Sequence, residues 1–180
     1  MKSLVIALFF PLCCLAQQTR SLQPGDTLPA HLLTSLTGNL QPETSNHLIL
    51  LDFFASWCAP CVRKFSTLDS IQDRFQDKVT IILVSSIGTT DNEERLNKFF
   101  AKHKKSNGTP WQFHLIINDT ILVKLFPHRI VPHYVWLYDN KVIAITSSAS
   151  VTVQNITALL DHQPFSLPVK NDELESKNKL

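Results

Sequence analysis

One short stretch, Trp57–Cys61 (sequence WCAPC), constrains this chain more than any other feature. It lies between a continuous apolar run at 48–54 and a segment whose apolar residues recur every three or four positions from Cys61 onward. A continuous apolar run is typical of a strand buried on both faces, and the second spacing is typical of an amphipathic helix. The two cysteines are therefore predicted to lie at a strand-to-helix corner.

Such a corner suits thiol–disulfide chemistry. Free backbone N–H groups and the positive end of the helix dipole stabilise a thiolate at Cys58. Cys61 follows one turn later on the same side of the helix, within reach of a disulfide. Pro60 loses no hydrogen bond in a first helical turn and stiffens it. We predict that Cys58, exposed at the corner, attacks a partner disulfide and that Cys61, set deeper, resolves the mixed disulfide.

Two other interpretations of the cysteine pair stay open at this point. A structural zinc commonly needs four ligands, so Cys58 and Cys61 would have to recruit histidines. His128 and His133 have a suitable spacing, although Pro132 and the adjacent strand disfavour their convergence on the cysteines. The pair could also be inert core residues of a binding module. A C-x-x-C motif near a βαβ pattern favours redox chemistry over both.

Asp52 is the second informative residue. It is the one acid within the apolar run 48–54, six residues before Cys58. Burial in a low dielectric is expected to raise its pKa, and isolated buried acids are rare without a function. We predict that Asp52 accepts the proton of the Cys61 thiol, through water. The alternative is a structural acid, either exposed or satisfied by a hydroxyl group.

The first 16 residues have the features of an export signal. Lys2 is followed by an almost entirely apolar run at 4–16, which is shorter than the roughly 20 residues that span a bilayer. We expect cleavage after Ala16 and a periplasmic protein. The alternative is a lipoprotein anchored to the membrane through Cys13 or Cys14.

The rest of the chain reads as one domain at 22–162, followed by a polar tail or linker at 163–180. Residues 20–46 are predicted to be an extended lead-in with a hairpin near Gly38-Asn39. Strands and helices then alternate, which predicts parallel strands covered by helices on both faces. The elements expected after the 48–54 strand are a helix from 61, a strand at 79–84, a helix through 96–100, a strand at 113–117, a short helix through 125, a hairpin at 134–138 and 141–146, and a helix through 151–160.

Three local patterns refine this picture. Thr90 and Glu93 have the spacing of a capping box at the start of the helix expected through 96–100. The charged run 102–105 is interpreted as the solvated end of that helix. Asp139-Asn140 is a two-residue hairpin signal. With a net charge of only +2, the chain carries no field that would select nucleic acid.

Together, the stretch 52–61 (DFFASWCAPC) and Val131-Pro132 before the predicted hairpin resemble the thioredoxin superfamily. The lead-in from Pro24 and the long segment between 84 and 113 are more similar to its exported TlpA/ResA-type branch, and the residues at 132–136 to members from Bacteroidota-type bacteria. The resemblance covers about 22–162. It implies an α/β thioredoxin-like fold, with a central mixed sheet, helices on both faces and an N-terminal extension or hairpin.

The resemblance also implies roles for particular residues. Pro132 matches the cis-proline beside the redox disulfide, and Val131 the residue whose backbone binds a substrate peptide. Trp57 matches the tryptophan beside the active site. Ala59-Pro60 replaces the Gly-Pro of thioredoxin, so this dipeptide is expected to tune the reduction potential to a different value.

The function implied is that of a periplasmic thiol–disulfide oxidoreductase that reduces protein disulfides. An oxidase or isomerase is the same chemistry in the other direction, and a metal-binding chaperone that uses Cys58 and Cys61 is the alternative from another class. We expect a monomer without an organic cofactor or metal. Because the compartment that receives an exported protein is oxidising, a membrane thiol–disulfide electron donor is expected to re-reduce the pair.

Overall fold

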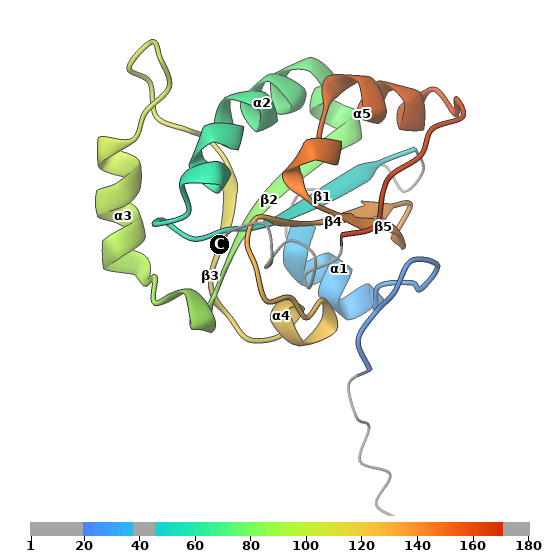
Figure 1. The fold of residues 1–180 in the computed structure, drawn as a ribbon, viewed down its shortest axis with the longest axis horizontal. Helices are drawn as coiled ribbons and strands as arrows, with labels where there is room; N and C mark the ends of the chain where they lie inside the picture. Colours follow the sequence, from blue (N-terminus) through green and yellow to red (C-terminus); the bar gives the residue numbers. More distant parts are fainter. Residues whose placement is uncertain (1–19, 38–45, 171–180) are drawn as a thin grey trace, which may run out of the picture.

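The computed structural model describes residues 20–37 and 46–170, and its centre is a five-stranded sheet in the order β3-β2-β1-β4-β5 (Figure 1). Its first three strands are mutually parallel, whereas β4 pairs antiparallel with β1 and β5 with β4. This confirms the predicted mixed sheet with an antiparallel hairpin. The strands are β1 (Leu48–Phe53), β2 (Val79–Ser86), β3 (His114–Asp119), β4 (His133–Tyr138) and β5 (Lys141–Thr146).

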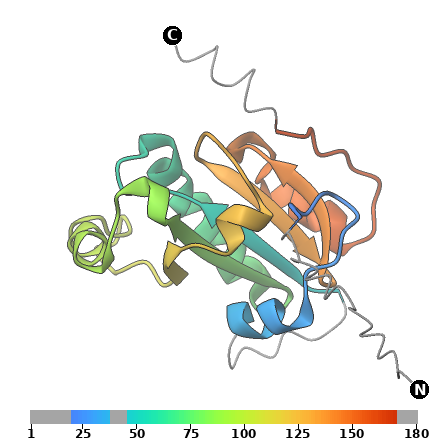
Figure 2. The ribbon, with the colours of Figure 1, turned by 90° about the horizontal axis from the view of Figure 1, so that it is seen from below.

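Helices cover both faces of this sheet (Figures 1 and 2). They are α1 (Ala30–Thr37), α2 (Ala59–Phe75), α3 (Glu93–Lys102), α4 (Leu122–Leu125) and α5 (Val153–Leu160). Short 3-10 turns occur at η1 (Gln76–Lys78), η2 (Ile87–Thr89) and η3 (Ser148–Ser150). In the described ranges 20–37 and 46–170, no helix is both long enough and apolar enough to cross a membrane.

Two apolar clusters form the core, one on each face of the sheet. The strand residues alternate between them, so that Leu50 and Phe54 join α2, α3 and α5, whereas Leu51 and Phe53 join α1 and α4. Phe65 of α2 is fully buried at the centre of the first cluster. Burial of one such side chain contributes about 1.5–3 kcal/mol, which fixes α2, and with it the cysteine corner, against β1.

The lead-in differs from the prediction. Instead of continuing as extended chain, it forms α1 directly after Pro29, whose carbonyl accepts from Leu32 and Leu33. Leu32, Leu33 and Leu36 pack on the second cluster, and this helical spacing is the signal that the prediction overlooked. The hairpin expected near Gly38-Asn39 lies outside the described residues.

The Asp139-Asn140 turn is confirmed. Both residues have positive φ, 49° and 65°, as a two-residue turn of the I′ type requires. The outer edge of β5 is covered at both ends: Val142 exchanges backbone hydrogen bonds with Gly25 and Asp26, and the Lys170 amide donates to the Ile145 carbonyl at 3.0 Å. Hence the polar stretch 163–170, which has no helix or strand, returns to the sheet.

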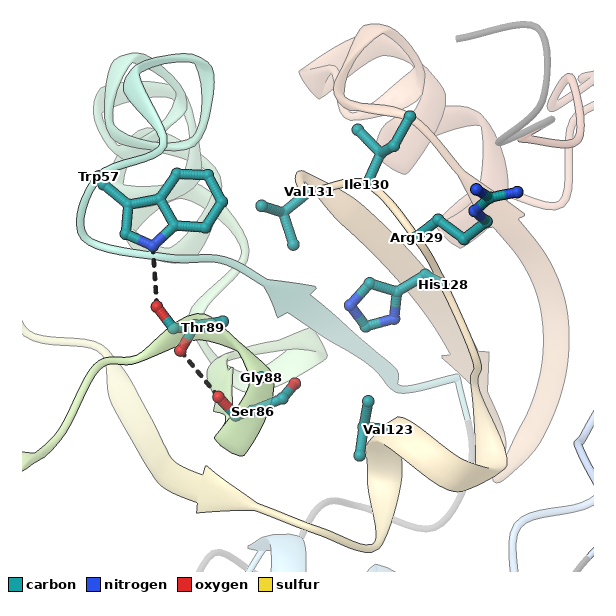
Figure 3. Close-up of a pocket in the computed structure, with 9 residues that line it drawn as sticks. All are labelled: Trp57, Ser86, Gly88, Thr89, Val123, His128, Arg129, Ile130 and Val131. Atoms are coloured by element: carbon teal, nitrogen blue, oxygen red, sulfur yellow. Dashed lines mark hydrogen bonds between the residues drawn. The ribbon is translucent and has the colours of Figure 1, made fainter. Parts of the chain in front are cut away.

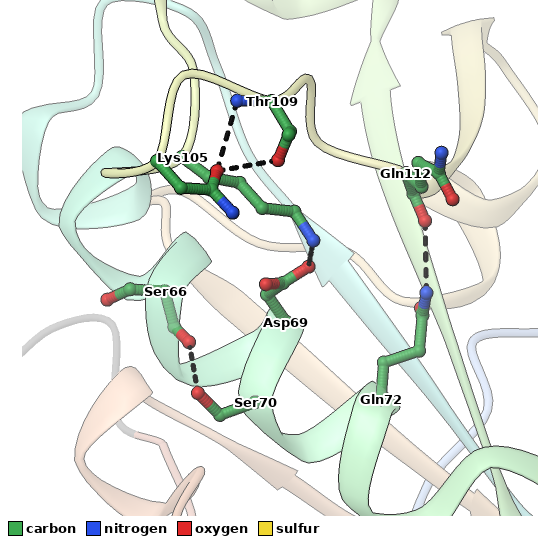
Figure 4. A network of polar contacts seen from close by, with 8 residues as sticks. Ser66, Asp69, Ser70, Gln72, Lys105, Thr109 and Gln112 are labelled. Atoms are coloured by element: carbon green, nitrogen blue, oxygen red, sulfur yellow. Dashed lines mark hydrogen bonds and ion pairs between the residues drawn. The ribbon is translucent and has the colours of Figure 1, made fainter.

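Both details predicted for α3 need correction. Its N-cap is Asn92, whose side chain accepts from the Arg95 amide at 2.8 Å, and not Thr90, which adopts a left-handed conformation with φ 65°. The charged run after the helix is also not simply solvated. Lys105 forms an ion pair of 2.6 Å with Asp69 of α2, as Figure 4 shows. This contact ties the loop before β3 to the helix that carries the cysteines.

Candidate active site

The two cysteines lie at the start of α2, as predicted. Cys58 is the N-cap residue, and Ala59 and Pro60 occupy the first turn. The Cys61 amide points at the Cys58 sulfur at 3.3 Å, which is the arrangement that stabilises a thiolate at a helix N-terminus. Cys58 and Cys61 form a disulfide with a Cα–Cα distance of 5.3 Å.

The exposure of Cys58 is lower than predicted. It is only 4% exposed, while Cys61 is 0% exposed, so Cys61 is the deeper of the two but both are buried. The reason is the N-cap geometry, which turns the Cys58 sulfur toward the first helical turn and its disulfide partner. The neighbouring Trp57, in contrast, is 63% exposed.

The segment that precedes the cysteines is held by the loop after β2. Asp91 accepts from both the amide and the hydroxyl of Ser56, at 2.7 and 2.5 Å. The Trp57 ring nitrogen donates to the Thr89 carbonyl at 2.8 Å (Figure 3). These contacts orient the Trp57 ring over the corner. Asp91 and Thr89 were not predicted as site residues, because nothing in their spacing links them to 56–57.

Asp52 is fully buried, as predicted, and its pKa is raised from 3.8 to about 8. The main cause is loss of hydration; the Tyr134 hydroxyl, which donates to its Oδ2 at 3.0 Å, and the Lys64 ammonium oppose the rise. Oδ1 has no hydrogen-bond partner among the described residues. The predicted burial is thus confirmed, and one oxygen is satisfied by a hydroxyl group, as in the structural alternative. The role of Asp52 as a proton acceptor stays a prediction.

The position of Asp52 in β1 directs it toward the cysteines. Residues alternate along a strand, and its neighbours Leu50 and Phe54 belong to the same cluster as Cys61 and Tyr134. Asp52 is paired with Tyr134 across β1 and β4. The acid therefore faces the side of the sheet that α2 covers.

Lys64 is the cation near this acid, and it stands on α2 rather than on a neighbouring strand. Burial lowers its pKa and the Asp52 carboxylate opposes the change. Lys64 was not among the residues predicted for the site. The sequence feature that could have indicated it is a lysine one helical turn after Cys61.

The Val131–Pro132 peptide bond is cis, the geometry that the resemblance implies. Pro132 is buried directly before β4, and Val131 is partly exposed. Val131 and Trp57 both line one cleft of about 310 Å³ (Figure 3). The remaining lining residues are Ser86, Gly88, Thr89, Val123, His128, Arg129 and Ile130. The structure thus brings the predicted residues Trp57, Cys58, Val131 and Pro132 to one end of the sheet.

The metal interpretation finds no ligand set in the part of the chain that the structure describes, where no three His, Cys, Asp or Glu residues are grouped around a common point. His128 and His133 stack on each other, with ring centroids 4.4 Å apart. Their spacing reflects this ring contact beside the cleft.

Comparison with known proteins agrees with this geometry. The model of a thioredoxin-like family matches residues 46–135, half of the chain. The chain belongs to the thioredoxin-like family. The match includes Asp52, both cysteines and Pro132.

Individual relatives give the same picture over shorter stretches. The chain is 27% identical over 81 residues to the thioredoxin-like protein YneN of Bacillus subtilis, which is 43% of this chain and 47% of that protein. It is 33% identical over 57 residues to thioredoxin of the same organism, 32% of this chain and 52% of the relative. The chain thus spans about half the length of these relatives.

Solved structures share the fold. The thioredoxin domain of a thiol-disulfide oxidoreductase from Bacteroides vulgatus superposes with a TM-score of 0.56 at 20% identity, covering 78% of this chain and 99% of that domain. A putative thiol:disulfide interchange protein DsbE from Chlorobium tepidum gives a TM-score of 0.57 at 21% identity, with the same coverage. These similarities confirm the predicted thioredoxin-like α/β fold.

Proposed function

We propose that this protein is an exported thiol–disulfide oxidoreductase that reduces disulfides in other proteins. The observation that carries the proposal is the disulfide between Cys58, the N-cap residue of α2, and Cys61, beside a cleft lined by Trp57 and Val131. An N-cap thiolate is activated, and a cleft next to it gives an incoming peptide a place to bind.

The reaction starts from the reduced pair. The Cys58 thiolate attacks one sulfur of the substrate disulfide, forming a mixed disulfide and releasing one substrate thiolate. The Cys61 thiolate then attacks the Cys58 sulfur, which restores the Cys58–Cys61 disulfide and releases the second substrate thiolate. Two electrons pass from the protein to the substrate.

Asp52 takes the proton of the Cys61 thiol before the second step in those molecules in which its carboxyl group is ionised, a minority at neutral pH because its pKa is about 8. A pKa of about 8 is close to that of an ordinary thiol, so the proton moves between the two groups with little cost. The free Oδ1 on the α2 side of the sheet is the oxygen available to accept it. Tyr134 holds the other oxygen and thereby orients the carboxyl group.

The cleft fits a segment of a protein better than a small polar molecule. Two exposed apolar side chains lie at its lining: Trp57, which is part of it, and Ile87, which stands between the lining residues Ser86 and Gly88. Exposed apolar groups around a hollow are typical of protein-binding surfaces. With the substrate segment bound in this cleft, the backbone of Val131 forms hydrogen bonds with the substrate backbone next to the substrate cysteine.

The proposed location is the periplasm, after export directed by residues 1–16. Its support is the apolar run at 4–16 with a small residue at Ala16. Anchoring through Cys13 or Cys14 is the alternative. In either case the protein acts as a monomer, and a membrane thiol–disulfide donor supplies electrons, because an oxidising compartment does not reduce the pair.

Reduction of insulin tests the proposed direction. The chain is reduced with dithiothreitol, freed of excess reagent and mixed with insulin, and we expect each equivalent of protein to release one pair of insulin thiols while Cys58 and Cys61 become oxidised. The control is Cys58→Ser, which retains one thiol and should release none. Oxidation of reduced insulin chains by the disulfide form, with no reaction in the forward direction, would show that the protein is an oxidase.

A further inference from the structure

Lys170 lies far from the cysteines in sequence, but its ammonium reaches the loop before the cis proline. It donates a hydrogen bond to the carbonyl of Ile130 and lies 3.4 Å from Nδ1 of His133. Both residues flank Val131-Pro132, and Ile130 and Val131 also line the cleft (Figure 3). The end of the stretch 163–170 is thus in contact with the wall of the candidate substrate site.

The backbone of the same stretch holds this ammonium in place. The Lys170 amide donates to the Ile145 carbonyl at the outer edge of β5, and Leu167 packs against the core cluster on the α5 side. Lys170 is partly buried. A lysine with a fixed backbone and a shielded side chain loses less conformational entropy on forming such a hydrogen bond than a lysine on an open surface.

The acceptor of this hydrogen bond determines its effect. The Ile130 carbonyl and the Val131 N–H belong to one planar peptide unit, so a cation on the oxygen draws electron density from the nitrogen and makes the N–H a stronger donor. Among the described residues, nothing accepts a hydrogen bond from this N–H. The polarised donor is therefore available to a ligand.

We propose that Lys170 is a positioning residue of the substrate site, which holds and polarises the Ile130–Val131 peptide unit so that the Val131 N–H binds a backbone carbonyl of the disulfide-bearing protein. This inference rests on the proposed function and adds a part of the chain that lies beyond the thioredoxin-like core. The ligand that Lys170 helps to position is the extended polypeptide segment of the proposed function. A disulfide without peptide groups has no backbone carbonyl for the Val131 N–H, so Lys170 does not affect its reduction.

Replacement of the ammonium tests this assignment. In Lys170→Met the aliphatic stem remains and the charge is lost, and we expect the KM for insulin to rise about three- to tenfold, the range for the loss of one net hydrogen bond, with kcat unchanged. The reaction with dithiobis(nitrobenzoate), a small disulfide without a peptide group, should keep its wild-type rate. Lys170→Arg, which retains a cationic donor, should restore most of the affinity.

The matched control is Lys78→Met, the same change at an exposed lysine in η1, which should leave both reactions unchanged. The Val131 amide proton provides a second measurement that does not need turnover: in the NMR spectrum of the oxidised protein it should move upfield in Lys170→Met and stay in place in Lys78→Met. An unchanged KM for insulin, an equal loss with both disulfides, or an unmoved Val131 resonance would overturn the role of Lys170. If the wild-type protein reduces neither disulfide, the proposed function fails, and the NMR comparison still decides whether Lys170 polarises the peptide unit.

Discussion

Cys61→Ser is expected to hold the protein in a mixed disulfide with its substrate through Cys58, whereas Cys58→Ser forms none. The difference follows from the positions of the two sulfurs. Cys58, at the N-cap of α2, keeps a small exposed fraction, whereas Cys61 is fully buried. Without Cys61, no internal thiolate displaces the substrate, so the reaction stops after its first step.

Mass spectrometry of protease digests measures this outcome. The reduced Cys61→Ser protein, mixed with insulin, should yield one covalent adduct per molecule at the peptide that contains Cys58, and dithiothreitol should release it. Multiple turnover should fall to the uncatalysed background in both variants. An adduct on Cys61 in Cys58→Ser, formed at the rate of the Cys58 adduct, would reverse the assigned roles.

Asp52→Asn is expected to stabilise the oxidised protein above neutral pH. The pKa of Asp52 is about 8 in the folded protein and near 3.8 in an unfolded chain. Between these values the folded protein binds more protons than the unfolded chain, so the free energy of unfolding falls as pH rises, by up to about 1.4 kcal/mol per pH unit from this one group. Asparagine removes this dependence, so the gain is near zero at pH 4, reaches several kcal/mol, by order of magnitude, at pH 8 and stays constant above it.

Urea unfolding at a series of pH values tests this prediction. The control is Asp73→Asn, an exposed acid on α2, which should give no such gain. In the same variant, resolution of the mixed disulfide should slow by about a hundredfold at neutral pH, because Cys61 loses its proton acceptor. Equal stabilisation at pH 4 and pH 8 would contradict the buried, protonated state of Asp52, and an unchanged resolution rate would leave the acid with a structural role alone.

The order of strands and helices could be predicted from the sequence because local signals specify it. The apolar run at 48–54, the three-four spacing from Cys61 and the Asp139-Asn140 turn each reflect one element and its neighbours. The error at α1 had a different origin. The Pro, Thr and Ser residues around it suggested an extended chain, whereas three leucines at helical spacing find an apolar surface on β1 and α4.

The parts of the site that could not be predicted depend on contacts between distant segments. Tyr134 meets Asp52 only because β4 pairs antiparallel with β1 in one register, and a shift by one residue would turn the hydroxyl to the other face. Asp91 reaches Ser56 through a loop whose path is set by the packing of α3. Lys170 reaches Ile130 only after the chain has passed around α5 and along the edge of β5.

The reduction potential of the Cys58–Cys61 pair tests the central claim most directly. The protein is equilibrated in thiol–disulfide buffers, and the oxidised fraction is read from tryptophan fluorescence and from thiol alkylation. We predict a reversible two-electron transition closer to the roughly −270 mV of thioredoxin than to the roughly −120 mV of the oxidant DsbA. A value near −120 mV would contradict the reductase direction, and the absence of a reversible transition would contradict the redox function itself.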